Sequence, residues 1–239
     1  MARLLVGLPA LQGDLEKYAS RFDLVELRPV DAALPKPSTL RRWRKTVPPS
    51  FVFSVVLPKI VGELTPGPEL DAALATSLEV ASVLEARCVI LQTPASVRPT
   101  AANKKRLAAV FDRMPREGTV RGWEPAGLWE REEVLATSRS LGVLPVLDIA
   151  REAPGSGPLL YTRLRALGKS TMLGAAALER IAERLRRRRE AFVVIEGTSE
   201  AARIKQALVS ELAKKPLRAS GVTVVRPGSS TLVAEDEEQ

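Results

Sequence analysis

The sequence predicts an α/β protein with the (β/α)8 fold of TIM-type barrels. Eight short apolar runs alternate with amphipathic segments along the chain. The runs are almost continuously apolar, as parallel strands covered by helices are, and no hairpin turn joins two of them. No glycine-rich phosphate loop follows any run, which disfavours an open nucleotide-binding sheet. Eight parallel strands therefore favour closure into a barrel.

The predicted strands and helices follow one another in a regular order. The strands cover 2–8, 23–27, 51–57, 88–92, 119–124, 143–148, 159–164 and 192–197. Apolar stripes at helical spacing predict helices over 13–22, 38–47, 69–87, 100–114, 128–142, 173–190 and 199–215. Ser38 and Thr100 have the chemistry of N-caps, and Gly142 that of a C-cap.

The regular alternation is interrupted between the sixth and seventh strands. The segment IAREAPGSGP (149–158) is short and rich in glycine and proline, so we expect one outer helix to be missing or reduced there. We expect residues 1–216 to form a single barrel. Residues 217–239, which contain Gly, Ser and Pro and end in an acidic cluster, are expected to form a flexible tail.

The absence of histidine restricts the possible chemistry. Imidazole bases, Ser-His-Asp triads and most zinc sites need that side chain. Catalysis would then depend on Glu, Asp, Lys or Arg, with Mg²⁺ or Mn²⁺ as the compatible metals. The sequence contains no zinc site and no nucleotide-cofactor motif.

Cysteine usage and the first residues of the chain indicate the compartment. Cys88 is the single cysteine, so no intramolecular disulfide can form. The first residues contain only a short apolar stretch and no signal-peptide pattern. We therefore expect a cytoplasmic protein without a membrane partner; nothing indicates its oligomeric state.

The basic balance of the chain raises the question of a polyanionic partner. The formal net charge is +8 at pH 7, which is compatible with nucleic-acid binding. Much of the excess is arginine on expected outer helix faces, as in 184–190. We interpret the arginines at 186–189 as a solvated face near a helix C-terminus.

Polar residues stand at or just beyond several strand ends, where the active face of such a barrel is built. They are Glu26, Arg28, Lys59, Gln92, Glu124, Asp148, Arg163, Arg165 and Glu196. Carboxylates at the ends of apolar strands are costly to bury unless they are paired. These residues therefore predict either an anion-binding or carboxylate-based pocket, or a ring of salt bridges closing the barrel mouth. Trp129, after the fifth strand, is a candidate pocket-lining residue.

Several motifs carry a resemblance to a known family. Val25-Glu26-Leu27, Leu34-Pro35-Lys36-Pro37, Trp43, Val47-Pro48-Pro49-Ser50-Phe51 and Leu57-Pro58-Lys59 follow one another within 17–61. This block resembles the domain of unknown function 72 family, the YecE-like proteins. Weaker similarity extends over most of 2–213 and includes ILQTPASVRPT, WEPAGLW, VLPVLDIA and LLYTRLRALG. The resemblance implies a TIM-type barrel.

The departures from the family pattern fall where a site would lie. The family's Asn after the second-strand Glu is Arg28 here, and its His near the seventh strand is Arg165. The Lys of its third strand corresponds to Val56, and its Arg-His pair after the fifth strand is absent. The resemblance thus implies a divergent member in which the family-type catalytic residues are largely lost.

Three functions remain open. The leading hypothesis is binding of an anionic small molecule at the C-terminal mouth. The second is a hydrolase or lyase that uses Glu26, Glu124 and Asp148, with Mg²⁺ or Mn²⁺ as a metal that could activate water. The third is nucleic-acid binding through a basic surface, which requires the Lys and Arg side chains to cluster on one face.

Overall fold

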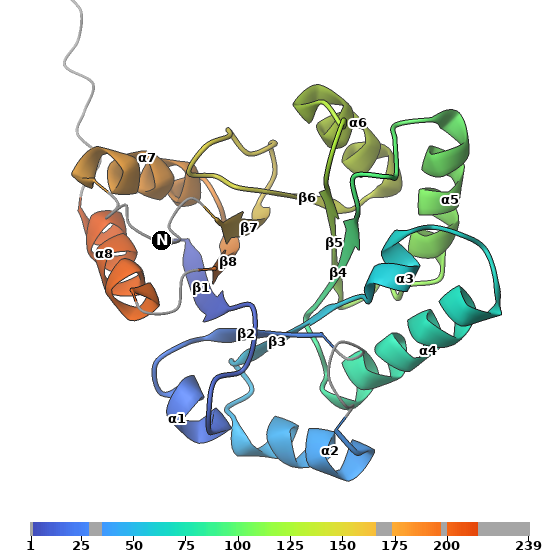
Figure 1. Ribbon diagram of the computed structural model, residues 1–239. Helices are drawn as coiled ribbons and strands as arrows, with labels where there is room; N and C mark the ends of the chain where they lie inside the picture. Colours follow the sequence, from blue (N-terminus) through green and yellow to red (C-terminus); the bar gives the residue numbers. More distant parts are fainter. Residues whose placement is uncertain (1, 29–34, 166–173, 197–199, 215–239) are drawn as a thin grey trace, which may run out of the picture.

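The computed structural model describes residues 2–28, 35–165, 174–196 and 200–214, and eight parallel strands of these ranges close into a barrel (Figure 1). Each strand pairs with its neighbours in sequence, and β8 returns to β1 with Arg3 opposite Glu190. The strands are β1 (Arg3–Leu8), β2 (Leu24–Leu27), β3 (Val52–Val56), β4 (Cys88–Thr93), β5 (Val120–Pro125), β6 (Leu144–Leu147), β7 (Leu159–Leu164) and β8 (Glu190–Ile195). The predicted fold is confirmed.

Helices surround the strands on the outside of the barrel (Figure 1). They are α1 (Leu15–Ala19), α2 (Pro37–Thr46), α3 (Lys59–Gly62), α4 (Pro68–Val83), α5 (Ala101–Asp112), α6 (Arg131–Leu141), α7 (Ala175–Arg186) and α8 (Ala201–Ala213). The short helix α3 was not predicted, because a single turn has too few residues to show a periodic pattern. No helix of the described ranges is long and apolar enough to cross a membrane.

The predicted caps differ in their outcome. Thr100 accepts a hydrogen bond from the Asn103 amide, and Gly142 adopts a positive φ of 62°, so both predictions are confirmed. The prediction for Ser38 was wrong, because α2 begins one residue earlier, at Pro37. Proline is favoured at the first helical position, since its fixed φ suits the helix and its missing N–H is not needed there.

The core has two layers, as the alternation of side chains along a strand requires. One layer fills the barrel interior with residues such as Leu5, Ile90 and Phe192. The other lies between the strands and the helices and includes Phe53 and Trp123. The described elements of the barrel run from Arg3 to Ala213, and the expected boundary at 216 and the expected tail 217–239 lie outside the described residues.

Residues 148–158, between β6 and β7, form turns and bends instead of a helix, as predicted. Their carbonyl groups are bound by arginine side chains from neighbouring elements. Arg184 donates to the carbonyls of residues 149 and 152, Arg131 to that of residue 153, and Arg188 to those of residues 155 and 157. The guanidinium groups thus satisfy acceptors that a helix would have satisfied internally.

These contacts correct the interpretation of the arginine run as a solvated face. Only Arg187 and Arg189 of the run 186–189 are exposed. Arg186 donates to the carbonyls of Glu211 and Lys214 at the end of α8, so it joins α7 to its neighbour. Part of the basic excess is therefore structural.

Candidate functional site

The carboxyl ends of the strands bring polar side chains into the mouth of the barrel. Four of them, Glu26, Gln92, Glu124 and Arg163, each follow by two positions a strand residue that faces the barrel interior. Because side chains alternate along a strand, these four also point inward. The strand register places Glu26 beside Ser54 and Gln92 beside Glu124. Side chains from four strands thus meet at one end of the barrel.

Arg163 lies at the centre of this cluster and is 1% exposed. Its guanidinium donates to both oxygens of Glu26, at 2.6 and 2.7 Å, and its Nε donates to Glu124 at 3.0 Å. Burial by itself would lower the pKa of Arg163, but the two carboxylates raise it above its ordinary value. Arg163 therefore stays charged and is the cationic partner that Glu26 and Glu124 share.

A fully buried chain of hydroxyl groups supports Glu26 from below. The Tyr161 hydroxyl donates to Glu26 Oε1 at 2.6 Å, and Ser54 Oγ lies 2.9 Å from the same hydroxyl. Since the single phenolic proton is used on Glu26, Ser54 donates to Tyr161. Burial and the nearby Glu26 raise the pKa of Tyr161, so the phenol remains a donor.

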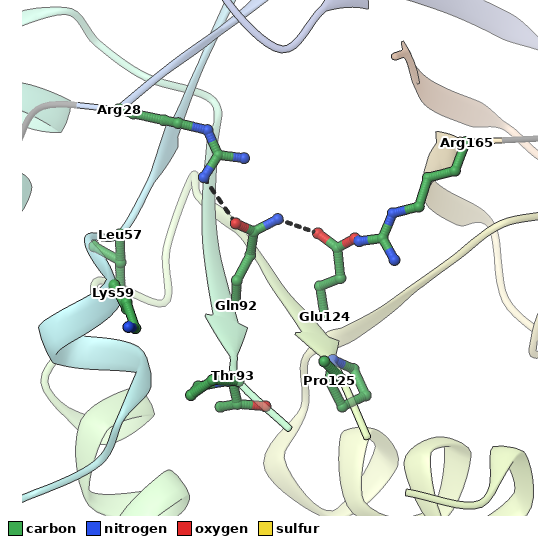
Figure 2. A pocket seen from close by; sticks show the side chains of 10 residues that line it. Arg28, Leu57, Lys59, Gln92, Thr93, Glu124, Pro125 and Arg165 are labelled. Atoms are coloured by element: carbon green, nitrogen blue, oxygen red, sulfur yellow. Dashed lines mark hydrogen bonds and ion pairs between the residues drawn. The ribbon is translucent and has the colours of Figure 1, made fainter. Parts of the chain in front are cut away.

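A row of side chains formed by Arg28, Gln92, Glu124 and Arg165 borders the pocket (Figure 2). Arg28 donates to Gln92 Oε1 at 2.8 Å, and Gln92 donates to Glu124 Oε2 at 2.6 Å. The Arg165 guanidinium contacts Glu124 and, at 3.4 Å, Glu196. Glu124 is thus held by two arginines and a glutamine, and it has no oxygen without a hydrogen-bond donor.

This row borders a pocket of about 290 Å³. Among the described residues that line it, the charged ones are Arg28, Lys59, Arg165 and Glu124. The rest of the lining is uncharged and includes Leu57, Gln92 and Pro94. Three cationic side chains therefore face the pocket together with one carboxylate, which is paired with Arg163 and with Arg165, itself one of the three cations.

Most of the predicted site residues come together in this mouth. Glu26, Arg28, Gln92, Glu124, Arg163, Arg165 and Glu196 form one connected network. Lys59 borders the pocket from α3, with a side chain that is 80% exposed and an ammonium group 3.7 Å from Glu63. Asp148 lies next to the network and accepts hydrogen bonds from the backbone amides of Ala150 and Arg165.

Trp129 lies away from the other predicted residues. Its indole N–H donates to the carbonyl of Val97 at 2.7 Å, and its ring packs edge-on against Trp123. The side chain is buried in the outer core layer and does not line the pocket. This placement gives a ligand contact by Trp129 no support.

Sequence reasoning missed Ser54 and Tyr161. Both are polar residues within strands, and Tyr161 stands two positions before Arg163, on the same face of β7. That spacing could have identified Tyr161 as a partner for the buried charges. Ser54 gave no such signal, because a serine in an apolar strand is common without a functional reason.

The donor set of the mouth is better suited to anions than to a metal ion. Within the described part of the chain, no three Asp, Glu or Cys side chains lie close enough together to hold a metal. The carboxylate oxygens of Glu26 and Glu124 already accept hydrogen bonds from arginine, glutamine or tyrosine donors. The groups that retain free donor atoms are cationic.

Comparisons with known proteins agree with this architecture. A family model described as a protein of unknown function, DUF72, matches residues 6–220. This match confirms the expected family. No curated protein matches the chain.

Solved structures of two members of that family share the fold. A DUF72 protein from Enterococcus faecalis is 17% identical with a TM-score of 0.68, and the match covers 90% of this chain and 99% of that one. A DUF72 protein from Thermotoga maritima is 16% identical with a TM-score of 0.64, covering 87% and 99%. D-psicose 3-epimerase from Clostridium cellulolyticum, solved with D-tagatose, is 12% identical with a TM-score of 0.59, covering 89% and 96%. At these identities the likeness establishes the barrel fold alone.

Proposed function

Because the chain belongs to the DUF72 family, whose description assigns no function, we propose from the site itself that the barrel mouth binds a small molecule bearing a carboxylate or phosphate group. The observation that carries the proposal is the charge of the pocket. Arg28, Lys59 and Arg165 face one cavity that contains one carboxylate among the described residues, Glu124, to which the buried Arg163 also donates.

The geometry of the two arginines suits an anion with several oxygen atoms. Arg28 uses one amino group on Gln92 and keeps its other donors, and the Arg165 side chain is 50% exposed. A guanidinium group binds carboxylate or phosphate oxygens through two parallel hydrogen bonds, whereas the Lys59 ammonium adds a point charge. Gln92 and Glu124 fix the orientation of both arginines from the floor of the pocket.

The carboxylate-based hydrolase or lyase receives less support. Glu26 is fully buried beneath Arg163, so substrate in the pocket could not reach it. Glu124 accepts from Arg163, Gln92 and Arg165 at once, which leaves no lone pair positioned to activate a water molecule. The same bonds make both carboxylates suitable for holding arginines in place.

Thermal unfolding with added anions tests the proposal. Phosphate, sugar phosphates, nucleotides and di- or tricarboxylates are compared with chloride at equal ionic strength. A ligand present at about 100 times its Kd should stabilise the protein by about 2.7 kcal/mol, which raises the Tm. Arg28→Gln and Arg165→Gln should each abolish most of this increase.

The matched control is Arg180→Gln, which removes an exposed cation of α7 that does not line the pocket. It should leave the ligand-induced increase in Tm unchanged. The proposal is wrong if no anion stabilises the native protein, or if the two pocket variants respond to anions as the control does.

A further inference from the structure

A second cationic surface lies on the outer face of α2, separate from the barrel mouth. No aspartate or glutamate occurs between Asp31 and Glu63, although this stretch contains Lys36, Arg41, Arg42, Arg44, Lys45 and Lys59. Helix α2 itself has no acidic residue. The surface therefore lacks the interspersed carboxylates that neutralise most basic helix faces.

Helical spacing gathers five of the α2 side chains on one side. Residues three and four positions apart are neighbours on a helix surface. Ser38, Arg41, Arg42, Lys45 and Thr46 accordingly line one groove of about 390 Å³, which we call the α2 groove. Its lining consists of three cations and two hydroxyl groups, of which that of Thr46 already donates to the carbonyl of Arg42.

The cations of the α2 groove have no structural task that would explain them. Arg44, on the same helix, donates to the carbonyls of Val47, Pro48 and Phe51 and so closes the end of α2. Within the described ranges, Arg41, Arg42 and Lys45 form no ion pair, and their charged groups donate no hydrogen bond. Several arginines elsewhere have such a task, as shown by Arg163 in the mouth and by Arg184 and Arg188 beside residues 148–158.

We propose that the α2 groove binds the sugar-phosphate backbone of a nucleic acid. Arginine, lysine and hydroxyl side chains are the groups that contact phosphate oxygens in such complexes. Arg41 and Lys45 are separated by about 6 Å along the helix axis, which is close to two steps between phosphates of one strand, at about 3.4 Å of rise each. Phosphate contacts carry no sequence information, so we expect binding through these side chains to be independent of sequence.

A membrane surface fits the α2 groove less well. Peripheral membrane helices combine a basic face with exposed apolar side chains that enter the lipid. Among the described residues, the large hydrophobic side chains that are exposed are Leu128 and Val209, and neither belongs to α2. The surface is therefore suited to a partner recognised by charge and hydrogen bonds alone.

Fluorescence anisotropy with a labelled DNA duplex and a labelled single strand tests this site. Contact with three phosphates predicts a slope of about −2.7 for log K against log salt, which weakens duplex binding roughly 40-fold between about 50 and 200 mM salt. The triple variant Arg41→Gln/Arg42→Gln/Lys45→Gln should lose at least about tenfold in affinity at low salt and most of that slope.

A charge-matched control separates a site from a general effect of net charge. The triple variant Lys105→Gln/Arg106→Gln/Arg180→Gln removes three exposed cations from α5 and α7 and should bind as the native protein does. Thermal unfolding of all variants checks that they are folded. Arg28→Gln and Arg165→Gln should leave nucleic-acid binding intact, so this proposal and that for the mouth succeed or fail separately.

Several outcomes would overturn the proposal. The first is a failure of the native protein to bind nucleic acid at about 50 mM salt, where the electrostatic contribution is strong. The second is an equal loss of affinity in the two triple variants. The third is binding of polyglutamate, or of vesicles containing an anionic phospholipid, as tightly as of nucleic acid at the same concentration of charge.

Discussion

At the scale of single residues, Arg163 is the side chain on which the mouth depends. It joins Glu26 of β2 to Glu124 of β5 across the barrel, and neither carboxylate has another cation as deeply buried. A buried ion pair contributes little net stability, because desolvation offsets the attraction. Removing one partner is different, since the remaining charge is then buried without compensation.

Replacement of Arg163 should therefore destabilise the protein strongly. We expect Arg163→Met to lower the free energy of unfolding by about 3–5 kcal/mol in urea titrations. Arg165→Met is the control from the same network, and its half-exposed side chain should cost less than about 1 kcal/mol. Equal losses in the two variants would contradict this account of Arg163.

The tyrosines allow a test with an optical signal. The chain has two, Tyr18 and Tyr161, and burial raises the pKa of each phenol above its ordinary value. In the unfolded chain both would ionise near pH 10. Because the folded-state pKa is raised, ionisation of the two phenols favours the unfolded chain. Their contribution to the free energy of unfolding is therefore complete below about pH 10 and is lost as the pH rises further.

Tyrosinate absorbance should therefore stay low in the folded protein above pH 10. It should rise together with the loss of circular dichroism, as one transition, when the barrel unfolds. In Tyr161→Phe the tyrosinate absorbance and the circular dichroism should still change together, with half of the absorbance change. Tyrosinate formation at pH 10 in a protein that remains folded would show that at least one phenol is accessible to solvent.

At the scale of elements, the segment between β6 and β7 shows how a barrel can tolerate a missing helix. Residues 148–158 leave several backbone carbonyls without helical partners, and Arg131, Arg184 and Arg188 supply the donors. Burial lowers the pKa of Arg188, with Arg187 as a smaller cause in the same direction, so this guanidinium sits in a partly desolvated position. The charge-assisted hydrogen bonds compensate for that desolvation.

The arginines around residues 148–158 should differ sharply in their effect on stability. Arg188→Gln should lower the free energy of unfolding by about 1–3 kcal/mol, because two carbonyls lose a charged donor. Trypsin should also cleave faster after Arg151, which lies in the released segment. Arg187→Gln is the matched control: its side chain is 78% exposed and paired only with Glu183 on the surface, so it should change stability by less than about 0.5 kcal/mol. Similar losses for both variants would contradict a special role of Arg188.

The strands and most helices could be predicted from the sequence because burial imposes a pattern on it. The errors occurred where local chemistry competes with that pattern. Pro37 began α2 before the serine that was expected to cap it. The arginine run extended the predicted helix to residue 190, although α7 ends at Arg186 and Glu190 already pairs with Arg3 in β1.

The candidate site was less predictable than the fold. Strand ends identified the polar residues of the mouth, because position on a parallel strand decides which end a side chain reaches. Their pairing could not be predicted, since the bonds of Arg163 to Glu26 and Glu124 depend on distances across the barrel. The α2 groove was equally hidden, because the sequence shows six cations in one stretch but not which of them have structural partners.

At the scale of the whole molecule, charge is distributed in three distinct ways. The mouth contains a network of paired charges, and the opposite end of the barrel is closed by Glu190 between Arg3 and Arg87. Arginines on α6 and α7 bind backbone carbonyls, and α2 presents cations without partners. Net charge alone could not separate these uses.

The closure of β1 against β8 has a consequence for folding kinetics. This pair joins strands 187 positions apart in the sequence, with Arg3 opposite Glu190. Bringing such distant segments together is slow, because the entropy cost of closing the loop arises before the contacts form. The Arg163–Glu26 contact spans 137 positions and links β7 to β2, so the mouth is complete only after the barrel has closed. A ligand of the mouth would therefore slow unfolding and leave the rate of folding almost unchanged.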